Sequence, residues 1–384
     1  MNFELSDEQT QLQRTVREFA RKEVQPLAKQ LDETGAFPLE TFRKAAALGL
    51  TGVAFPESEG GAGFDHVSTA VMIEEISRVC ASTGVILSVQ NSLCGEPLHR
   101  FGSDAQKKKF LAPFLRGEKI GCYALTEAQA GSDASAIETR AVRKADRYVV
   151  NGAKAWITNG GVADAAIVYV KTDPAAGEQG ITALVIERGE NGKSGFRVGK
   201  EEKKLGIHAT ACVELWFDDC EVPVENRLGE EGQGYRIALS TLDGGRVGIA
   251  AQATGIAQGA FDHALAYAQQ RRAFGHTISD FQAIQFMLAD VATEIEAARC
   301  LVRQAAWKQD RGERFSREAS IAKLFASELA TRATHKAMQI HGANGYSREY
   351  PIERMYRDAR VTEIYEGTSQ IQRLVIAGWV LKSA

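Results

Sequence analysis

The 384-residue sequence predicts an α+β multidomain chain with three parts. These are an N-terminal α-helical domain, a middle domain resembling a β-barrel or sandwich, and a C-terminal four-helix-bundle domain. Apolar residues recur at helical spacing toward both ends, whereas the middle is rich in β-branched and aromatic runs. The length also exceeds that of one ordinary domain. We expect the domains at residues 1–120, 121–232 and 233–384.

The N-terminal part begins with an amphipathic helix. Within DEQTQLQRTVREFARKEVQPLAK (7–29) the apolar positions follow a period close to 3.6, at Leu12, Val16, Phe19 and Val24. Ser6 precedes Gln9 by three residues, which fits a capping box. The glycine-rich PESEGGAGFD (56–65) does not follow a strand, so it is predicted to connect helices rather than to bind a dinucleotide.

The middle part changes to strand patterns. RYVVNGAKAWITNG (147–160) has β-prone runs on both sides of Asn151–Gly152, which predicts a hairpin turn there. AAIVYVKT, GITALVIER and VELWFDDCEVP follow, separated by turn-forming residues. Together they predict a compact all-β domain.

Helices return after Gly234. DFQAIQFMLADVATEIEAARCLV (280–302) has apolar residues at alternating steps of three and four: Phe281, Ile284, Leu288, Val291, Ile295, Ala298 and Val302. That narrow seam is typical of a long bundle helix, with Asp280 as its expected N-cap. SREASIAKLFASELATRATHKAMQI (316–340) predicts a second long helix, because it is rich in alanine and other good helix formers.

Composition excludes several classes of function. The net charge of −3 suggests neither a nucleic-acid partner nor a polybasic membrane contact. No window has the roughly 18 consecutive apolar residues of a membrane span, and the N-terminal residues predict no signal peptide. The six cysteines and seven histidines show no metal-ligand spacing, so no metal is expected. Reduced thiols fit a bacterial cytoplasm or a mitochondrial matrix.

Two segments of the β domain have the composition of a cofactor site. CYALTEAQAGSD (122–133) is dense in small side chains, hydroxyls and backbone donors that could line a flat heteroaromatic ring, although it could equally be a plain connection. KAWITNG (154–160) places Trp156 and Thr158 on a strand. The tryptophan could shield a planar cofactor or simply fill the core.

Three segments of the C-terminal domain also stand out. The adjacent arginines of QQRRAFG (269–275) could grip a phosphate or stay solvated. The glycines of QIHGANGYSREYP (339–351) could admit a ligand to the backbone or end a helix. In TEIYEGTSQIQR (362–373), Glu366 lies between apolar residues and a small-residue turn. It could cap a helix or act as a base.

These five segments occur in the order expected for the acyl-CoA dehydrogenase family, which the chain resembles. Further motifs carry the resemblance: KLGI, LDGGRVGIA, GIAQ and RDARVTEIYEGTSQIQRLVIAG. The motif sequences are most similar to those of its short-chain (butyryl-CoA) and short branched-chain members. The resemblance implies FAD as cofactor and oxidation of an acyl-CoA to the trans-2-enoyl-CoA, in fatty acid β-oxidation or branched-chain amino acid degradation. It also implies electron-transfer flavoprotein as the electron acceptor and a homotetramer built as a dimer of dimers.

The resemblance also assigns residues. Glu366 would abstract the α-proton while the β-hydride goes to flavin N5. The matching cofactor-binding positions are Tyr123, Leu125, Thr126, Ser132, Trp156, Thr158, Arg271, Phe274, Gln282, Gln339, Gly342, Ala343, Thr368 and Gln370. Of these, Arg271, Gln282 and the turn Gln339–Ala343 would reach FAD from a neighbouring subunit. The substrate-binding positions are Ser132, Asp243, Arg246 and Gly367.

One position supports Glu366 as the base, and others depart from the family pattern. One family variant carries its base on the LDGGR helix, but the matching position is Gly245, which favours Glu366. Asp243 and Arg246 could instead be members of a buried ion pair. Ala343, His341 and His208 depart from common residues; we expect His208 to be a surface or loop residue rather than a catalyst.

Two rival functions share this pattern. An acyl-CoA oxidase would reoxidise FAD with oxygen; such relatives are usually considerably longer, which counts against this reading. A non-catalytic FAD- or CoA-binding scaffold of the same fold would be expected to lack Glu366 or the cofactor positions, and none is missing.

Overall fold

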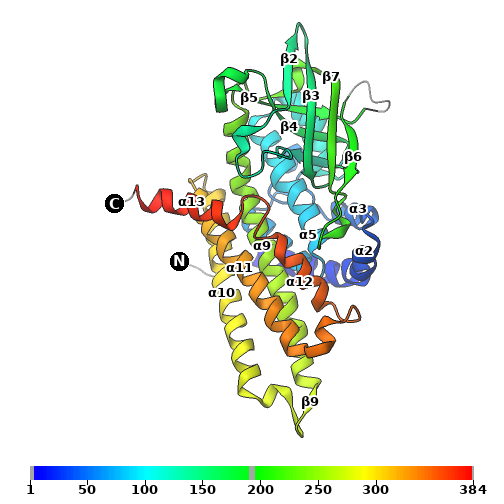
Figure 1. Ribbon diagram of the computed structural model, residues 1–384, viewed down its shortest axis with the longest axis vertical. Coiled ribbons are helices and arrows are strands. Elements are labelled where there is room, and N and C mark those ends of the chain that lie inside the picture. The colour runs from blue at the N-terminus through cyan, green and yellow to red at the C-terminus, as the bar shows by residue number, and fades with distance from the viewer. Residues whose placement is uncertain (1–3, 190–194, 383–384) are drawn as a thin grey trace.

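The computed structural model describes residues 4–189 and 195–382. The ends of the predicted first and third domains, residues 1–3 and 383–384, lie outside them. Strands form one end of the molecule, and three long helices run lengthwise toward the other end (Figure 1). The N-terminal helices pack beside the long helices and below the sheet, with the two labelled α2 and α3 at the right of the view (Figure 1). The order helical, β, helical is the predicted one.

The N-terminal part is built from short helices. They are α1 (Asp7–Phe19), α2 (Ala28–Thr34), α3 (Leu39–Ala47), α4 (His66–Ser77), α5 (Ala81–Ser88), α6 (Glu96–Phe101), α7 (Asp104–Gln106) and α8 (Ala112–Leu115). Ser6 and Gln9 form the predicted reciprocal capping box at the start of α1. Leu12, Val16 and Phe19 are buried, as their spacing predicted.

The β domain holds one mixed sheet. Its strands are β1 (Gly121–Ala124), β2 (Arg140–Lys144), β3 (Arg147–Ile157), β4 (Ala165–Lys171), β5 (Ile181–Glu187), β6 (Arg197–Glu201), β7 (Val213–Pro223) and β8 (Arg227–Leu228). They run in the order β6-β7-β3-β2-β4-β5-β8, with β1 parallel to β4. The predicted strand runs 165–172, 180–188 and 213–223 correspond to β4, β5 and β7.

Strands β4 and β5 are buried on both faces, which explains their unbroken apolar sequences. Alternate residues point to opposite sides of a strand. Ile167 and Tyr169 belong to a core cluster shared with the helices, whereas Ala166 and Val168 belong to a cluster formed within the β domain. The sheet is therefore anchored to the helical part by one face of its central strands.

The predicted hairpin turn at Asn151–Gly152 is wrong. Strand β3 continues through both residues, and the turn that joins β2 to β3 lies at Ala145–Asp146. The pairing of β3 with β7 shifts between Val150 and Gly152, and Gly152 has φ +144°, so the dipeptide forms a β-bulge. An Asn-Gly pair favours left-handed backbone both in a hairpin turn and in a β-bulge. The dipeptide alone therefore could not distinguish the turn from the bulge.

The C-terminal part contains α9 (Gly234–Gln270), α10 (Gln282–Asp310), α11 (Ser316–His341), α12 (Ile352–Val361) and α13 (Ser369–Val380). Short strands β9 (Arg272–Ala273) and β10 (His276–Thr277) form a hairpin between α9 and α10. On α10 the seam is buried from Val291 to Val302, but its first turns are only partly covered. Asp280 is not the N-cap: it ends a preceding 3₁₀ turn, and Phe281 occupies the cap position without a side-chain hydrogen bond.

Helix α9 passes close to α4 because glycines line the crossing. A Cβ at Gly255 would lie 2.3 Å from the carbonyl oxygen of Glu74, and one at Gly259 would lie 2.1 Å from that of Arg78. Both neighbours are backbone atoms, which cannot rotate away. The close approach of these two helices therefore depends on the absence of side chains at the two positions.

We predict that Gly255→Ala lowers the free energy of unfolding by about 1–3 kcal/mol, because the added methyl overpacks the α4–α9 crossing. Gly378→Ala on α13 is the matched control, since nothing lies within 4 Å of its Cβ position. The control should be neutral or stabilising by up to about 1 kcal/mol. Urea unfolding measures both, and equal effects of the two changes would contradict the crossing argument.

Candidate active site

Glu366 occupies a turn between α12 and α13 whose backbone is left-handed. It has φ +50°, and Gly367 follows with φ +91°. A residue other than glycine rarely adopts such angles, and they are maintained only where the surroundings fix them. Thr368 caps α13, because its side chain accepts a hydrogen bond from the Ile371 N–H at 3.3 Å. Glu366 itself caps no helix.

The Glu366 carboxylate is enclosed and incompletely paired. Its Oε2 atom is buried without a hydrogen-bond partner. It rests against α9: a Cβ at Gly245 would lie 2.0 Å from Oε2 and 3.0 Å from a methyl group of Leu93. The glycine at 245 therefore leaves the space that the carboxylate fills, and the two positions cannot both carry a side chain in this arrangement.

Burial raises the pKa of Glu366 to about 7, while the positive charges of Lys323 and Arg246 act in the opposite direction. Arg246 is buried on α9 and donates from Nη1 to Asp243 Oδ1 at 2.7 Å. Asp243 also accepts a hydrogen bond from Ser316. The buried ion pair that the sequence left open is thus present beside the carboxylate, and Arg246 Nε has no partner.

Lys323 is a residue that the sequence analysis missed. It lies on α11 and is fully buried, and its Nζ donates to the Gly367 carbonyl at 2.7 Å. Burial lowers the pKa of Lys323 to about 8. In the sequence it is one lysine among the good helix formers of an alanine-rich helix, so only its packing against the 366–367 turn distinguishes it.

A second buried lysine organises the loop after β1. Lys154 Nζ donates to the Leu125 carbonyl at 3.0 Å and to Glu127 Oε1 at 2.7 Å. Glu127 in turn accepts the backbone N–H groups of Glu138 at 2.6 Å and Thr139 at 3.0 Å. The start of the 122–133 loop is therefore tied to β3 and to the residues just before β2. Neither charged residue was singled out from the sequence.

The predicted cofactor residues of the β domain lie around this loop. The Thr126 carbonyl accepts from the Ala155 N–H at 2.9 Å, which brings Trp156 and Thr158 beside Leu125 and Thr126. Trp156 is 56% exposed and has φ +61°, so it is not the core residue that the sequence allowed. Tyr123 and Leu125 are buried, whereas Ser132 is exposed. An exposed tryptophan beside backbone donors fits a planar ligand.

Thr368 and Gln370 follow Glu366 at the start of α13. The other six predicted cofactor residues lie at the far end of the helical part, where α9 leads into β9 and α11 ends (Figure 1). They are exposed: Arg271, Phe274, Gln282, Gln339, Gly342 and Ala343. Tyr267 on α9 joins the two segments, because its ring stacks on His341 with 4.3 Å between centroids and its hydroxyl accepts from Asn344 at 2.9 Å. His341 is thus a structural residue, and its pKa is lowered by burial.

His208 also departs from the residue common in the family. It is half-buried between the N-terminal helices and a loop of the β domain. Its Nδ1 lies 2.8 Å from the Asp32 carbonyl oxygen and its Nε2 2.9 Å from that of Lys204. Asp32 also pairs with Arg357 of α12 at 2.6 Å. The histidine therefore joins the N-terminal helices to a β-domain loop.

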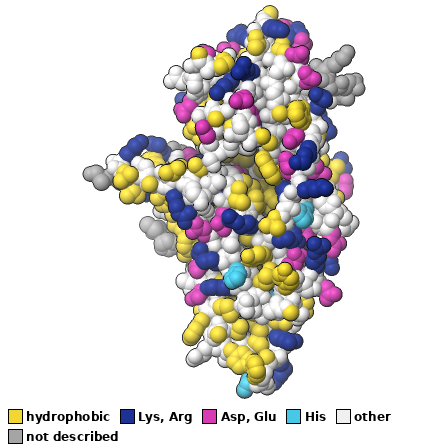
Figure 2. Space-filling model, viewed as in Figure 1, with side chains coloured by type: hydrophobic (Ala, Val, Ile, Leu, Met, Phe, Trp, Pro, Cys, Tyr) yellow, Lys and Arg dark blue, Asp and Glu magenta, His cyan; other side chains and the backbone are white. Residues whose placement is uncertain are grey.

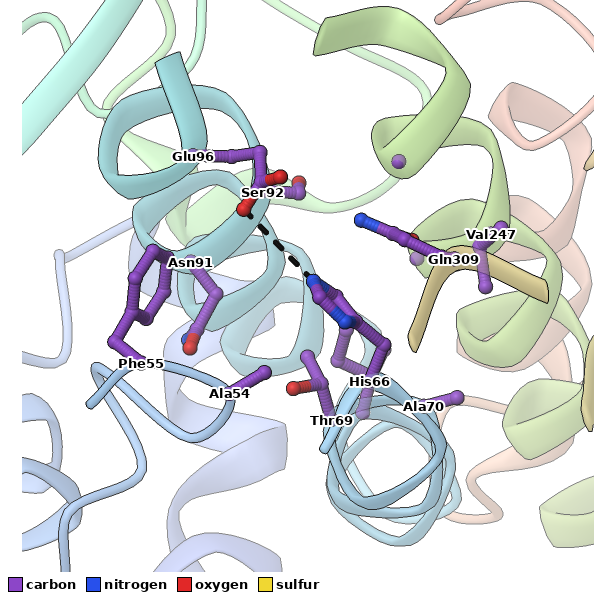
Figure 3. A pocket seen from close by; sticks show the side chains of 13 residues that line it. Ala54, Phe55, His66, Thr69, Ala70, Asn91, Ser92, Glu96, Val247 and Gln309 are labelled. Carbon is purple, nitrogen blue, oxygen red and sulfur yellow. Dashed lines mark ion pairs between the residues drawn. The ribbon is translucent and has the colours of Figure 1, made fainter. Parts of the chain in front are cut away.

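A cavity of about 30 Å³ lies on another flank of α9, beside Gly244 and Gly248 (Figure 3). His66 points into it and lies 3.8 Å from Glu96, while Asp310 accepts from the His66 backbone and ring. Burial lowers the pKa of His66, but these acidic partners outweigh it and raise the value to about 9. The cavity has room for a water molecule or two and includes neither Glu366 nor Gly245.

On the face shown in Figure 2 the surface is hollowed below the β domain, and hydrophobic side chains gather there. Within residues 4–189 and 195–382, no group of His, Cys, Asp and Glu could hold a metal ion. No helix in the same ranges is long and apolar enough to cross a membrane. In a helical–β–helical chain, a carboxylate with one buried, unpartnered oxygen and an exposed tryptophan on the β domain are the features of a candidate active site.

Comparisons with known proteins give the family. Three family models match, described as acyl-CoA dehydrogenase N-terminal domain (6–118), middle domain (122–220) and C-terminal domain (232–381). The short-chain specific acyl-CoA dehydrogenase of Clostridium acetobutylicum is 49% identical over 382 residues, covering all of both chains. The human mitochondrial short-chain enzyme is 50% identical over 100% of this chain and 92% of its own. The chain belongs to the acyl-CoA dehydrogenase family, whose members are FAD-dependent oxidoreductases.

Solved structures agree with this family. Butyryl-CoA dehydrogenase from Megasphaera elsdenii superposes with a TM-score of 0.97 at 45% identity, over 99% of this chain and 100% of that one. A prolyl acyl carrier protein oxidase is also similar, with a TM-score of 0.93 at 32% identity over 98% and 100% of the two chains. Since that oxidase is fully covered, chain length alone does not separate this chain from an oxidase of that kind.

We predict that Lys154→Met lowers the free energy of unfolding by about 3–5 kcal/mol, because it leaves Glu127 as a buried, uncompensated charge. The double change Lys154→Met with Glu127→Gln should recover part of that loss, since glutamine still offers an acceptor to the backbone. Denaturant titration of both variants measures the difference. A single change that costs less than about 1 kcal/mol would contradict a role for this ion pair.

Proposed function

We propose that this protein is an FAD-dependent acyl-CoA dehydrogenase that converts a short-chain or short branched-chain acyl-CoA to the trans-2-enoyl-CoA. The observation that carries the proposal is the Glu366 carboxylate, enclosed against Gly245 with an unpaired oxygen. The substrate class is supported by the short-chain specific relatives and by the similarity to butyryl-CoA dehydrogenase.

Glu366 is the proposed base for the α-proton of the thioester. That proton is weakly acidic, so a carboxylate near its usual pKa would be a poor acceptor. Burial strengthens Glu366 as a base by raising its pKa to about 7. Gly367 has no side chain, so its backbone is open to the thioester. The ion pair of Asp243 and Arg246 lies beside this space and is proposed to contact the substrate, together with Ser132.

The proposed FAD contacts within one chain come from the β domain and the turn after Glu366. Backbone and hydroxyl groups of the 122–133 loop would hold the edge of the flavin ring, and Trp156 and Thr158 would flank it. The residues in this set are Tyr123, Leu125, Thr126, Ser132, Trp156, Thr158, Thr368 and Gln370. FAD, when bound, supplies the acceptor for the β-hydrogen and its electron pair.

The exposed set at the far end of the bundle supports a shared site. Arg271, Phe274 and Gln282 are exposed there, as is the 339–343 turn apart from Ile340 and His341. They are separated from the β domain by the length of the helices (Figure 1). We propose that they complete the cofactor site of a second subunit in a homotetramer. Electron-transfer flavoprotein is the proposed electron acceptor, and one similar structure, at 46% identity, is described as that of an electron transferring flavoprotein.

Glu366→Gln should retain FAD and bind butyryl-CoA, yet bleach the flavin about 10²–10⁴-fold more slowly, because the proton acceptor is gone. Stopped-flow absorbance at substrate saturation measures the rate constant. Flavin content and thioester binding serve as controls for folding. Bleaching at more than a tenth of the wild-type rate would mean that another group is the base.

Gly245→Ala should slow bleaching by at least about tenfold, because its methyl group would occupy the space of the Glu366 carboxylate and displace the base by more than 1 Å. Gly244→Ala is the matched control on the same helix, since its Cβ would meet only the Gln309 side chain at 3.4 Å. The control should bleach at close to the wild-type rate. Equal losses in both variants would indicate a general effect of packing on α9.

An acyl-CoA oxidase is the second candidate, favoured by the similarity to the prolyl acyl carrier protein oxidase. For a dehydrogenase we expect the substrate-reduced enzyme to reoxidise slowly in air and rapidly with electron-transfer flavoprotein. Stopped-flow reoxidation with and without oxygen distinguishes the two functions. Fast turnover in air with release of peroxide would establish the oxidase and exclude the dehydrogenase.

A further inference from the structure

Two side chains hold the turn that carries the proposed base. Lys323 of α11 donates to the Gly367 carbonyl at 2.7 Å. Gln372 of α13 donates to the same oxygen at 2.9 Å and to the Glu366 carbonyl at 3.2 Å. Two donors on one carbonyl oppose its rotation, so they stabilise the left-handed angles at Glu366 and Gly367.

A glutamine could supply such a hydrogen bond without a charge, so the buried ammonium of Lys323 requires another explanation. Burying a charge is costly unless an opposite charge or several hydrogen bonds compensate it. The carbonyl of Gly367 is one neutral acceptor. The negative groups that face Lys323 are Glu366 and Glu363. Glu363 already accepts from Thr331 at 2.5 Å and pairs with Arg360 at 2.9 Å.

Glu366, by contrast, has an unpaired oxygen and few charged neighbours. Lys323 on α11 and Arg246 on α9 are the cations that face it within the described residues. Arg246 is already engaged by Asp243 at 2.7 Å. The hydroxyls of Tyr123 on β1 and of Tyr365 also face it, and burial raises the pKa of both phenols well above the usual value, so they carry no charge near neutral pH.

We propose that Lys323 is a positioning residue for the base: its ammonium fixes the Glu366–Gly367 turn through the Gly367 carbonyl, and its charge stabilises the ionised carboxylate of Glu366. This inference rests on the proposed function, because it concerns the same carboxylate. It assigns the lysine two separable effects, one through a hydrogen bond and one through charge. Gln372 shares the first effect only.

The two ionisations define a pH range. Because the pKa of Glu366 is raised to about 7, its carboxyl is protonated below that pH and is a base only above it. Because the pKa of Lys323 is lowered to about 8, the lysine keeps its charge up to that pH. Removing the charge should make ionisation of Glu366 harder, so the acid limb of the rate profile should move to higher pH.

Three variants of the holoenzyme separate the effects. Lys323→Met removes the donor and the charge; Lys323→Gln removes the charge but keeps an amide donor; Gln372→Met removes a donor to the same carbonyl and leaves the charge. The rate constant of flavin bleaching by butyryl-CoA is measured across pH. The infrared carboxyl band that disappears in Glu366→Gln is titrated without substrate, and thermal unfolding reports stability.

We expect the midpoint of the rate profile and of the carboxyl titration to rise by about one pH unit in both Lys323 variants. In Gln372→Met we expect a lower Tm with an unmoved midpoint. Midpoints that stay in place in Lys323→Gln, or that move equally in Gln372→Met, would overturn the role of the charge. If Glu366→Gln itself bleaches normally, the proposed function fails instead, so the two failures are distinguishable.

Discussion

The candidate site depends on a carboxylate, that of Glu366, whose Oε2 atom is buried without a hydrogen-bond partner. Enclosing Glu366 costs free energy, and that same cost raises its pKa toward neutrality, where it can accept a proton. The surrounding residues limit the cost without removing it. Gly245 leaves space for the carboxylate, and the left-handed turn points it toward α9. Lys323 and the ion pair of Arg246 place positive charge nearby.

The Glu366 carboxylate and a side chain at position 245 exclude one another in this structure. A Cβ at Gly245 would lie 2.0 Å from Glu366 Oε2, so a side chain on α9 and a carboxylate from the 366 turn compete for one space. In this chain the carboxylate of the 366 turn occupies the space that Gly245 leaves on α9.

The three parts of the chain contribute different physical roles to the site. The helical bundle provides rigid support, because Lys323 and Arg246 project from long helices. The β domain provides a loop fixed by the buried pair of Lys154 and Glu127, with Trp156 exposed beside it. The residues near β9 lie too far along the bundle to meet this loop in the same chain (Figure 1). In the homotetramer that we propose, a second subunit would bring them together.

The sequence by itself determined the order of the domains and the helical and strand periodicities, because local patterns encode these features. Its motifs, through the family resemblance, also singled out Glu366 as the proposed base. It did not determine the bulge at Asn151–Gly152, since one dipeptide suits two backbone settings. The sequence also did not indicate that Lys323 and Lys154 are buried, because a lysine in a sequence is ordinarily expected at the surface. Only the tertiary structure decided which charges lose their water and face one another, because burial arises from contacts between segments far apart in the chain.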